Sequence, residues 1–180
     1  MSTETLRPNA AGDSTQFTPY PNTGEANWED VDEETADNDT TYVYNSTTPA
    51  KTDVYNLTPH TGSGTINSVT VYAVAKKTGG TGNNITIVIR TGGTNYNGAT
   101  GAQSLTTSYA TYSDSWATNP KSGNPWSWDD IDALQAGCTL SYKIGYQNRC
   151  TQVYVVVDYT PPPAVKPRYG FVNFQDPGIL

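Results

Sequence analysis

Few side chains in this sequence of 180 residues could carry out acid–base or nucleophilic chemistry. His60 is the single histidine, and no serine is surrounded by the glycines of a nucleophile elbow. Asp129, Asp130 and Asp132 fall within one turn of a predicted helix, so the sequence gives no carboxyl the distinct environment that separate acid and base roles require. One histidine and two cysteines are too few ligands for a zinc site. We therefore predict that the chain is not an enzyme.

An acidic segment offers a different chemistry, that of a calcium ligand. Residues 25–39, EANWEDVDEETADND, hold eight of the seventeen acidic residues, and Asp37, Asn38 and Asp39 place hard oxygen atoms close together. Calcium binds six to eight such oxygens, but the spacing lacks the glycine and distal glutamate of an EF-hand. A run of this kind is also typical of a solvated loop or of a surface that faces a basic partner. Calcium at Asp37 and Asp39 is thus one hypothesis, and no other cofactor is expected.

The charge and hydropathy of the chain exclude two classes of partner. The net charge is −7 and the ten basic residues are scattered singly, so the sequence offers no basic stripe for a phosphate backbone. No apolar stretch approaches the roughly 20 residues that span a bilayer. The opening MSTETLRPNAAGDSTQ also lacks the apolar run of a secretory signal. We expect neither nucleic-acid nor membrane binding, and we expect synthesis in a cytoplasm.

The elements that would position these side chains are strands. Hydrophobic residues make up only 35% of the chain, and Thr, Asn, Gly, Ser and Tyr are abundant. Residues 66–75 alternate, with Val69, Val71, Ala73 and Ala75 on one face and Tyr72 and Val74 on the other. Residues 84–91 place three isoleucines, Ile85, Ile87 and Ile89, on one face. Residues 138–146 and 151–159 predict a hairpin about the turn QNR. We place strands 66–75 and 151–159 at the centre of their sheet, because they are the most apolar.

Seven or eight short strands separated by turn signals predict an all-β protein with a single antiparallel β-sandwich, jelly-roll-like in topology. We assign residues 25–159 to this sandwich. Residues 1–24 have no periodicity and several prolines, which favours an extended N-terminal arm. Residues 160–180 form a Pro-rich linker followed by a C-terminal arm.

One stretch, NPWSWDDIDALQAG, predicts a short helix near residues 128–136. Ser127 and Asp130 have the spacing of a capping box, and Trp126 and Ile131 hold the two positions of a hydrophobic staple. Gly137 would supply the left-handed residue that ends many helices. The acids are explained by helix capping and the helix dipole. The tryptophans are explained by packing, so this helix is expected to plug the end of the sandwich.

The two cysteines, Cys138 and Cys150, begin the two strands of the predicted hairpin. A disulfide requires Cα atoms within roughly 7 Å, which symmetrical pairing about QNR does not provide. Two buried free thiols are therefore favoured over a bridge.

Several motifs together resemble a known group of proteins. They are TETLRPNAAGD, TYVY, GTINSVTVYAVAKK, IRTGGTNYNG, NPKSGNPWSWDDIDALQAG and CTQVYVVVDY, which span roughly residues 2–159. In this combination the chain resembles uncharacterised β-sandwich proteins encoded by tailed bacteriophages and prophages, which are taken to be virion structural proteins. The resemblance implies a place in a virus particle and no catalytic residues.

The carboxyl-terminal tail suggests how such a protein would assemble. Pro161–Pro163 favour a stiff, extended spacer. Beyond it lie five apolar residues with no predicted element to bury them: Phe171, Val172, Phe174, Ile179 and Leu180. We expect them to pack against a neighbouring subunit.

Three functions are consistent with these patterns. The favoured one is a virion structural protein: a capsid decoration (cement) protein or a neck, tail or fibre component that binds copies of itself and a major capsid or tail protein. The first alternative is a carbohydrate-binding module for host or surface adhesion, with a sugar platform formed by Tyr96, Tyr109, Tyr112 and Trp116. The second alternative is an extracellular filament subunit.

Overall fold

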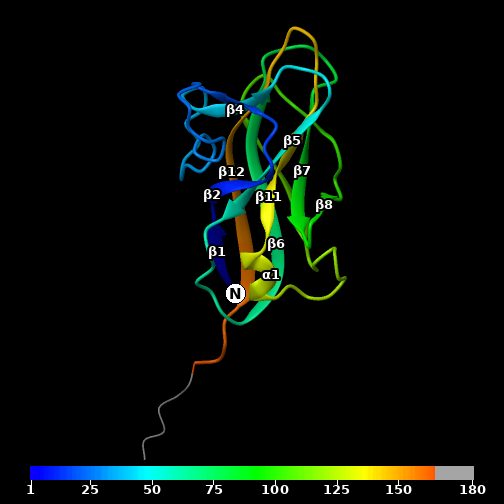
Figure 1. Ribbon diagram of the computed structural model, residues 1–180. Helices are drawn as coiled ribbons and strands as arrows, with labels where there is room; N and C mark the ends of the chain where they lie inside the picture. Colours follow the sequence, from blue (N-terminus) through cyan, green and yellow to red (C-terminus); the bar gives the residue numbers. More distant parts are fainter. Residues whose placement is uncertain (165–180) are drawn as a thin grey trace, which may run out of the picture.

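The computed structural model describes residues 1–164, which form two antiparallel six-stranded sheets packed as a sandwich, with a short helix at one end (Figure 1). The first sheet consists of β1 (Ser2–Leu6), β3 (Thr18–Tyr20), β4 (Tyr42–Asn45), β6 (Thr65–Lys77), β10 (Ala110–Trp116) and β12 (Asn148–Thr160). The second consists of β2 (Pro8–Ser14), β5 (Lys51–Leu57), β7 (Asn84–Thr91), β8 (Thr94–Asn97), β9 (Gln103–Ser104) and β11 (Gln135–Leu140). The predicted all-β sandwich with one short helix is confirmed.

The order of the strands is that of a jelly roll. The first sheet runs β10-β6-β12-β4 and the second runs β8-β7-β11-β5, with every pairing antiparallel. The chain changes sheet at every step from β4 to β7, stays in the second sheet through β8 and β9, and changes sheet again at every step from β9 to β12, which gives the two four-stranded sheets of this topology. β6 and β12 lie side by side inside the first sheet, as their apolar sequences predicted.

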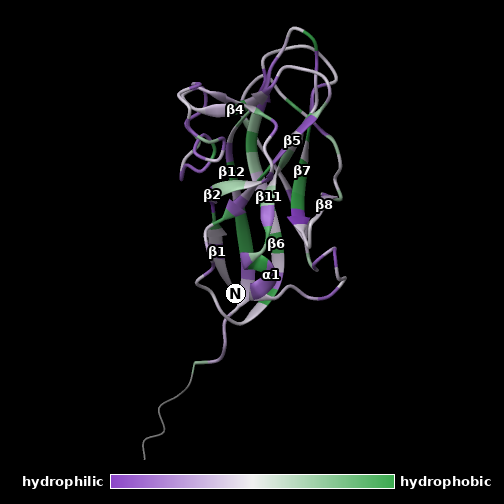
Figure 2. Cartoon of the chain, in the orientation of Figure 1, coloured by the Kyte–Doolittle hydropathy of each residue, from purple (hydrophilic) through white to green (hydrophobic). Residues whose placement is uncertain are grey.

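The core lies between the two sheets. β6 buries Val69, Val71, Ala73 and Ala75 on one face, and β7 buries the three isoleucines that the sequence placed together. Figure 2 shows this pattern as hydrophobic residues along the central strands, with mostly hydrophilic and neutral residues in the loops. The outer face of the first sheet carries a stacked aromatic pair, Tyr72 and Tyr154, with ring centroids 4.8 Å apart.

The predicted hairpin of residues 138–146 and 151–159 is wrong. β11 pairs with β5 and β7 in the second sheet, whereas β12 pairs with β6, β4 and β1 in the first. β11 ends at Leu140, and Ile144, which the alternation placed on a strand, is 75% exposed. Alternation indicates which face of a strand is buried but carries no information about the neighbouring strand, so two consecutive strands of opposite sheets can resemble a hairpin.

The cysteines are affected by the same change of partner. Cys138 on β11 and Cys150 on β12 approach each other from opposite sheets, inside the core. Both are free, as expected. A hydrogen bond with the Cys150 thiol and burial together raise the pKa of Cys138 well above its usual value, which keeps the thiol protonated.

Helix α1 (Trp128–Asp132) is shorter than predicted, although its start is confirmed. Ser127 and Asp130 form the reciprocal capping box, and Ala133 follows the last helical residue as the C-cap. Gly137 is not a helix terminus but a residue of β11, so that prediction is wrong. A Cβ atom on Gly137 would lie 2.0 Å from the carbonyl oxygen of Asp53 on the adjacent strand. Glycine is therefore required there for a close approach of two backbones.

Residues 1–24 are extended, as expected, but they do not form a separate arm. β1 pairs with β12 from Ser2↔Tyr159 to Leu6↔Val155, β2 pairs with β5, and β3 pairs with β4. The segment is therefore part of the sandwich, and the expected boundary at residue 24 is corrected. These strands lie at sheet edges and alternate between exposed and half-buried polar residues, so hydrophobic periodicity does not detect them.

Candidate functional site

The acidic segment, residues 25–39, lies along the edge of β12 in the interval between β4 and β1. β4 pairs with residues 148–150 of β12 and β1 with residues 155–159. Between them the amide of Val153 donates to the carbonyl of Val31 at 2.8 Å, and Gln152 Nε2 donates to the carbonyl of Glu33 at 2.6 Å. In Figure 1 the segment forms the blue loops beside β4. It therefore fills a gap in the edge of the first sheet.

The other side of the segment is held by Asp53, a fully buried residue of β5. Its Oδ1 accepts hydrogen bonds from the amides of Gln16 and Phe17, the latter at 2.8 Å. Its Oδ2 accepts from Asn27 Nδ2 at 2.7 Å and from the Tyr55 hydroxyl at 3.2 Å. Burial raises the pKa of Asp53, and these hydrogen bonds oppose the rise. One carboxylate thus joins β5, the amino-terminal chain and the acidic segment.

The two residues predicted as calcium ligands are engaged by other groups. Asp39 pairs with Lys76 Nζ at 2.6 Å and Arg149 Nη1 at 2.8 Å. The hydrogen bond from Lys76 lowers the pKa of Asp39 most, and the one from Arg149 lowers it further. Asp37 accepts from the amide and hydroxyl of Thr41 and from the hydroxyl of Thr151. The structure therefore does not bring Asp37 and Asp39 together as a pair of free ligands, because donors of the chain itself occupy both carboxylates.

Two other acids of the segment have buried carboxylate oxygens to which nothing donates. Asp30 is 1% exposed, and neither of its carboxylate oxygens has a hydrogen-bond partner. Glu33 accepts from the Thr41 hydroxyl through Oε1, but its buried Oε2 has no partner. Burial raises the pKa of Asp30 to about 7, and the nearby carboxylates, Glu25 and Glu33 foremost, add to the effect. Asp30 and Glu33 together therefore hold three buried carboxylate oxygens that have no hydrogen-bond partner.

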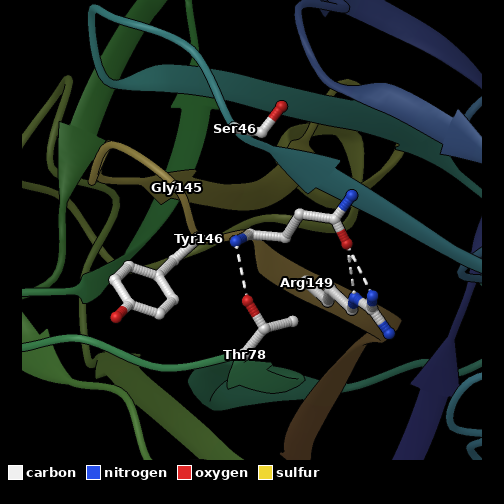
Figure 3. Close-up of a pocket in the computed structure, with 6 residues that line it drawn as sticks. Ser46, Thr78, Gly145, Tyr146 and Arg149 are labelled. Atoms are coloured by element: carbon white, nitrogen blue, oxygen red, sulfur yellow. Dashed lines mark hydrogen bonds between the residues drawn. The ribbon is translucent and has the colours of Figure 1, made fainter.

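A shallow cavity of about 470 Å³ opens at the end of β12 where the acidic segment ends (Figure 3). Arg149 connects the cavity with the acidic segment, because its guanidinium binds Gln147 Oε1 as well as Asp39 and lies over the Tyr42 ring.

One wall of the cavity is the Tyr146 ring, which packs against Gly79 and Gly80. Cβ atoms at these two glycines would come within 2.6 Å and 2.8 Å of the ring. The remaining lining residues, Ser46, Thr78 and Gly145, supply hydroxyls and main-chain groups.

The single histidine is a structural residue of the helical end of the sandwich. His60 Nδ1 lies 2.7 Å from Asp132 Oδ1, and its ring stacks on Trp128 with centroids 4.7 Å apart. Trp128 Nε1 donates to the carbonyl of Gly64 at 2.9 Å, and Glu4 accepts from the amides of Thr61 and Gly62. These contacts attach the loop between β5 and β6 to α1 and β1.

The four residues predicted as a sugar platform do not form one. Tyr112 on β10 is 8% exposed, so its ring belongs to the core, and Trp116 on the same strand packs against that core. The Tyr109 hydroxyl donates to Asn38 and Asp39 of the acidic segment. Tyr96 lies on β8 in the other sheet. A period-2 pattern that is rich in tyrosine does not distinguish an inward ring from an outward one.

No protein-family model matches this chain, and no curated protein sequence is significantly similar to it. Within residues 1–164, no helix is long and apolar enough to cross a membrane. The predicted assembly residues Phe171, Val172, Phe174, Ile179 and Leu180 lie outside the described residues.

Sequence reasoning missed Asp30, Asp53 and Arg149. Asp30 is one of eight acids in a mostly polar segment, and composition alone does not mark it as buried. The one available signal was its position between Trp28 and Val31, the two large apolar residues of the segment. When two apolar residues such as Trp28 and Val31 pack against the core, the residues between them lie close to it.

Proposed function

We propose that this chain is a structural protein of a bacteriophage-like virus particle, as a capsid decoration protein or a component of the neck, tail or fibre. Its resemblance to phage-encoded β-sandwich proteins covers residues 2–159, which is nearly the whole sandwich. The jelly-roll topology is compatible with this role but serves many others, so the fold alone does not select it. The proposal places the chain in the virion, in contact with copies of itself and with a major capsid or tail protein.

The observation that carries the proposal is the way the chain leaves the sandwich. β12 ends at Thr160, beside β1 and α1, and residues 161–164 are exposed and unpaired. In Figure 1 this stretch leads away from the end of the sandwich. The prolines favour an extended spacer, and the apolar residues that follow are suited to docking in a neighbour. The carbohydrate-binding alternative is less well supported, because its aromatic residues are divided between core and loop contacts.

Truncation after Thr160 is expected to leave a folded sandwich that no longer assembles. Within residues 1–164, all strands and the core end at or before Thr160, so the unfolding midpoint should be unchanged. An aromatic residue that docks in a neighbour buries roughly 150–250 Å², which contributes about 25 cal/mol per Å². The loss of Phe171 and Phe174 therefore removes several kcal/mol of binding free energy, from which the entropy cost of ordering the tail is subtracted. Sedimentation of the full-length and truncated proteins, alone and with particles, measures the effect.

A full-length variant with Phe171→Ser, Phe174→Ser and Leu180→Ser is the matched control, because it keeps the spacer and the chain length. It should behave as the truncated protein does. If the truncated protein unfolds, the tail belongs to the core, and if it assembles as well as the full chain, the tail is passive. Either outcome contradicts the proposed assembly role.

A further inference from the structure

Buried polar atoms without a partner are concentrated in the acidic segment. Within the described residues, six buried side-chain oxygens have no hydrogen-bond partner, and three of them are both oxygens of Asp30 and Oε2 of Glu33. The other three belong to Asn83, Asp114 and Asn148, each of which makes a hydrogen bond through its second polar atom. Asp30 alone among these five residues has no hydrogen-bond partner at either of its polar atoms. Native proteins pair nearly all such groups, so an orphaned pair of carboxylate oxygens indicates a missing ion, water or proton.

The charges around Asp30 favour a cation over any other partner. Residues 25–39 contain eight acids and no basic residue. The basic side chains that reach the segment are already committed: Lys76 and Arg149 bind Asp39, and Arg7 donates to the main-chain carbonyls of Glu33 and Glu34. A buried carboxylate without a counter-charge is costly, and the neighbouring acids increase that cost. A divalent cation would offset both the cost of burying the Asp30 carboxylate and its repulsion by the neighbouring acids.

We propose that Asp30 and Glu33 bind a divalent cation of the calcium class, a property separate from the role in a particle. The oxygens left without a partner are carboxylate oxygens, and no His or Cys lies in the segment, which suits calcium better than zinc. No group of three or more His, Cys, Asp or Glu side chains in residues 1–164 is arranged as a metal site, so main-chain carbonyls and water must complete the coordination. Calcium accepts such irregular sets of oxygens, whereas magnesium demands a near-octahedral arrangement.

The cation would stabilise the contact between the acidic segment and the sandwich. Val31, next to Asp30, is fully buried and binds β12 through its carbonyl, and Asn27 binds Asp53 on β5. Asp30 lies between these two anchors in sequence. Neutralising the charge of Asp30 therefore stabilises the attachment of the acidic segment to both sheets.

Thermal unfolding in EDTA and in calcium chloride at matched ionic strength tests the proposal. With calcium at about ten times a dissociation constant of roughly 1 mM, the melting temperature of the natural protein should rise by about 4 °C. Magnesium at the same concentration should have a smaller effect. Asp30→Asn, which keeps the side-chain shape, should lose the calcium response. Glu34→Gln removes the same charge from an exposed position and should keep the response.

Glu33→Gln provides a second variant should Asp30→Asn fail to fold, and its calcium response should fall at least twofold. Calorimetric titration of the folded proteins with calcium alone measures the same binding without heating. The proposal is overturned if calcium does not stabilise the natural protein, or if Asp30→Asn or Glu33→Gln responds as fully as Glu34→Gln does. In those cases Asp30 is held neutral by a proton.

Discussion

Replacing Asp53 by alanine is expected to destabilise the protein by about 3–5 kcal/mol, because several buried hydrogen-bond donors lose their acceptor at once. The carboxylate accepts four hydrogen bonds, two of them from the main-chain amides of Gln16 and Phe17. Without it, the buried Phe17 amide, the Tyr55 hydroxyl and one N–H of Asn27 lose their acceptor, and each buried donor left unpaired costs about 1–3 kcal/mol. Urea unfolding followed by tryptophan fluorescence measures the loss.

Two further variants separate this network from a general effect of lost charge. Asp53→Asn keeps one carbonyl oxygen for the two amides but turns an NH2 group toward Asn27 and Tyr55, so its stability should be intermediate. Asp129→Ala, on the exposed face of α1, should change stability by less than about 1 kcal/mol. A loss below about 1 kcal/mol for Asp53→Ala would show that Asp53 does not join the three segments.

Replacing Trp126 by alanine is expected to cost about 3–5 kcal/mol, the range for large truncations in a core. Trp126 is 5% exposed, and its Nε1 donates to the carbonyl of Trp116 at 3.0 Å. It also occupies the position before the helix cap, opposite the buried Ile131. Its removal therefore opens a cavity at the helical end and weakens the start of α1. The free energy of unfolding in denaturant is again the measurement.

Trp128 provides the comparison, because it lies two residues away but is only half-buried. It stacks on His60 and meets the edge of Tyr159, so Trp128→Ala should lose less, about 1–3 kcal/mol. Trp126→Phe keeps most of the ring and loses the hydrogen bond, at a cost of about 1–2 kcal/mol. Equal effects of alanine at both positions would contradict the packing described for this end.

The parts of the fold that the sequence predicted are those with a strong local signal. Alternation identified β6 and β7, and the spacing of Ser127 and Asp130 identified the start of α1. The partner of β11 could not be predicted, because its inward residues fit either sheet equally well. Gly137 was misassigned for a related reason: the close approach of Asp53 that requires glycine there comes from a strand 84 residues earlier in the chain.

The candidate site was predicted less well than the fold. The acidic segment was recognised from composition, but composition does not separate Asp39, which pairs with Lys76 and Arg149, from Asp30, which has no partner. Both basic partners come from strands remote in sequence, β6 and β12. The burial of Asp30 likewise depends on the attachment of Val31 to β12. Such tertiary contacts cannot be predicted from the sequence of a loop, because a loop has no hydrophobic periodicity that indicates which of its residues are buried.

The central claim is that the chain is a component of a virus particle, and its abundance in purified particles tests this most directly. Particles would be purified through a density gradient, washed in high salt and analysed by quantitative mass spectrometry against the major capsid protein. We predict a fixed number of copies per particle, constant between preparations and retained after washing. Absence from the purified particles, or an amount that varies and is removed by washing, would contradict a structural role in the virion.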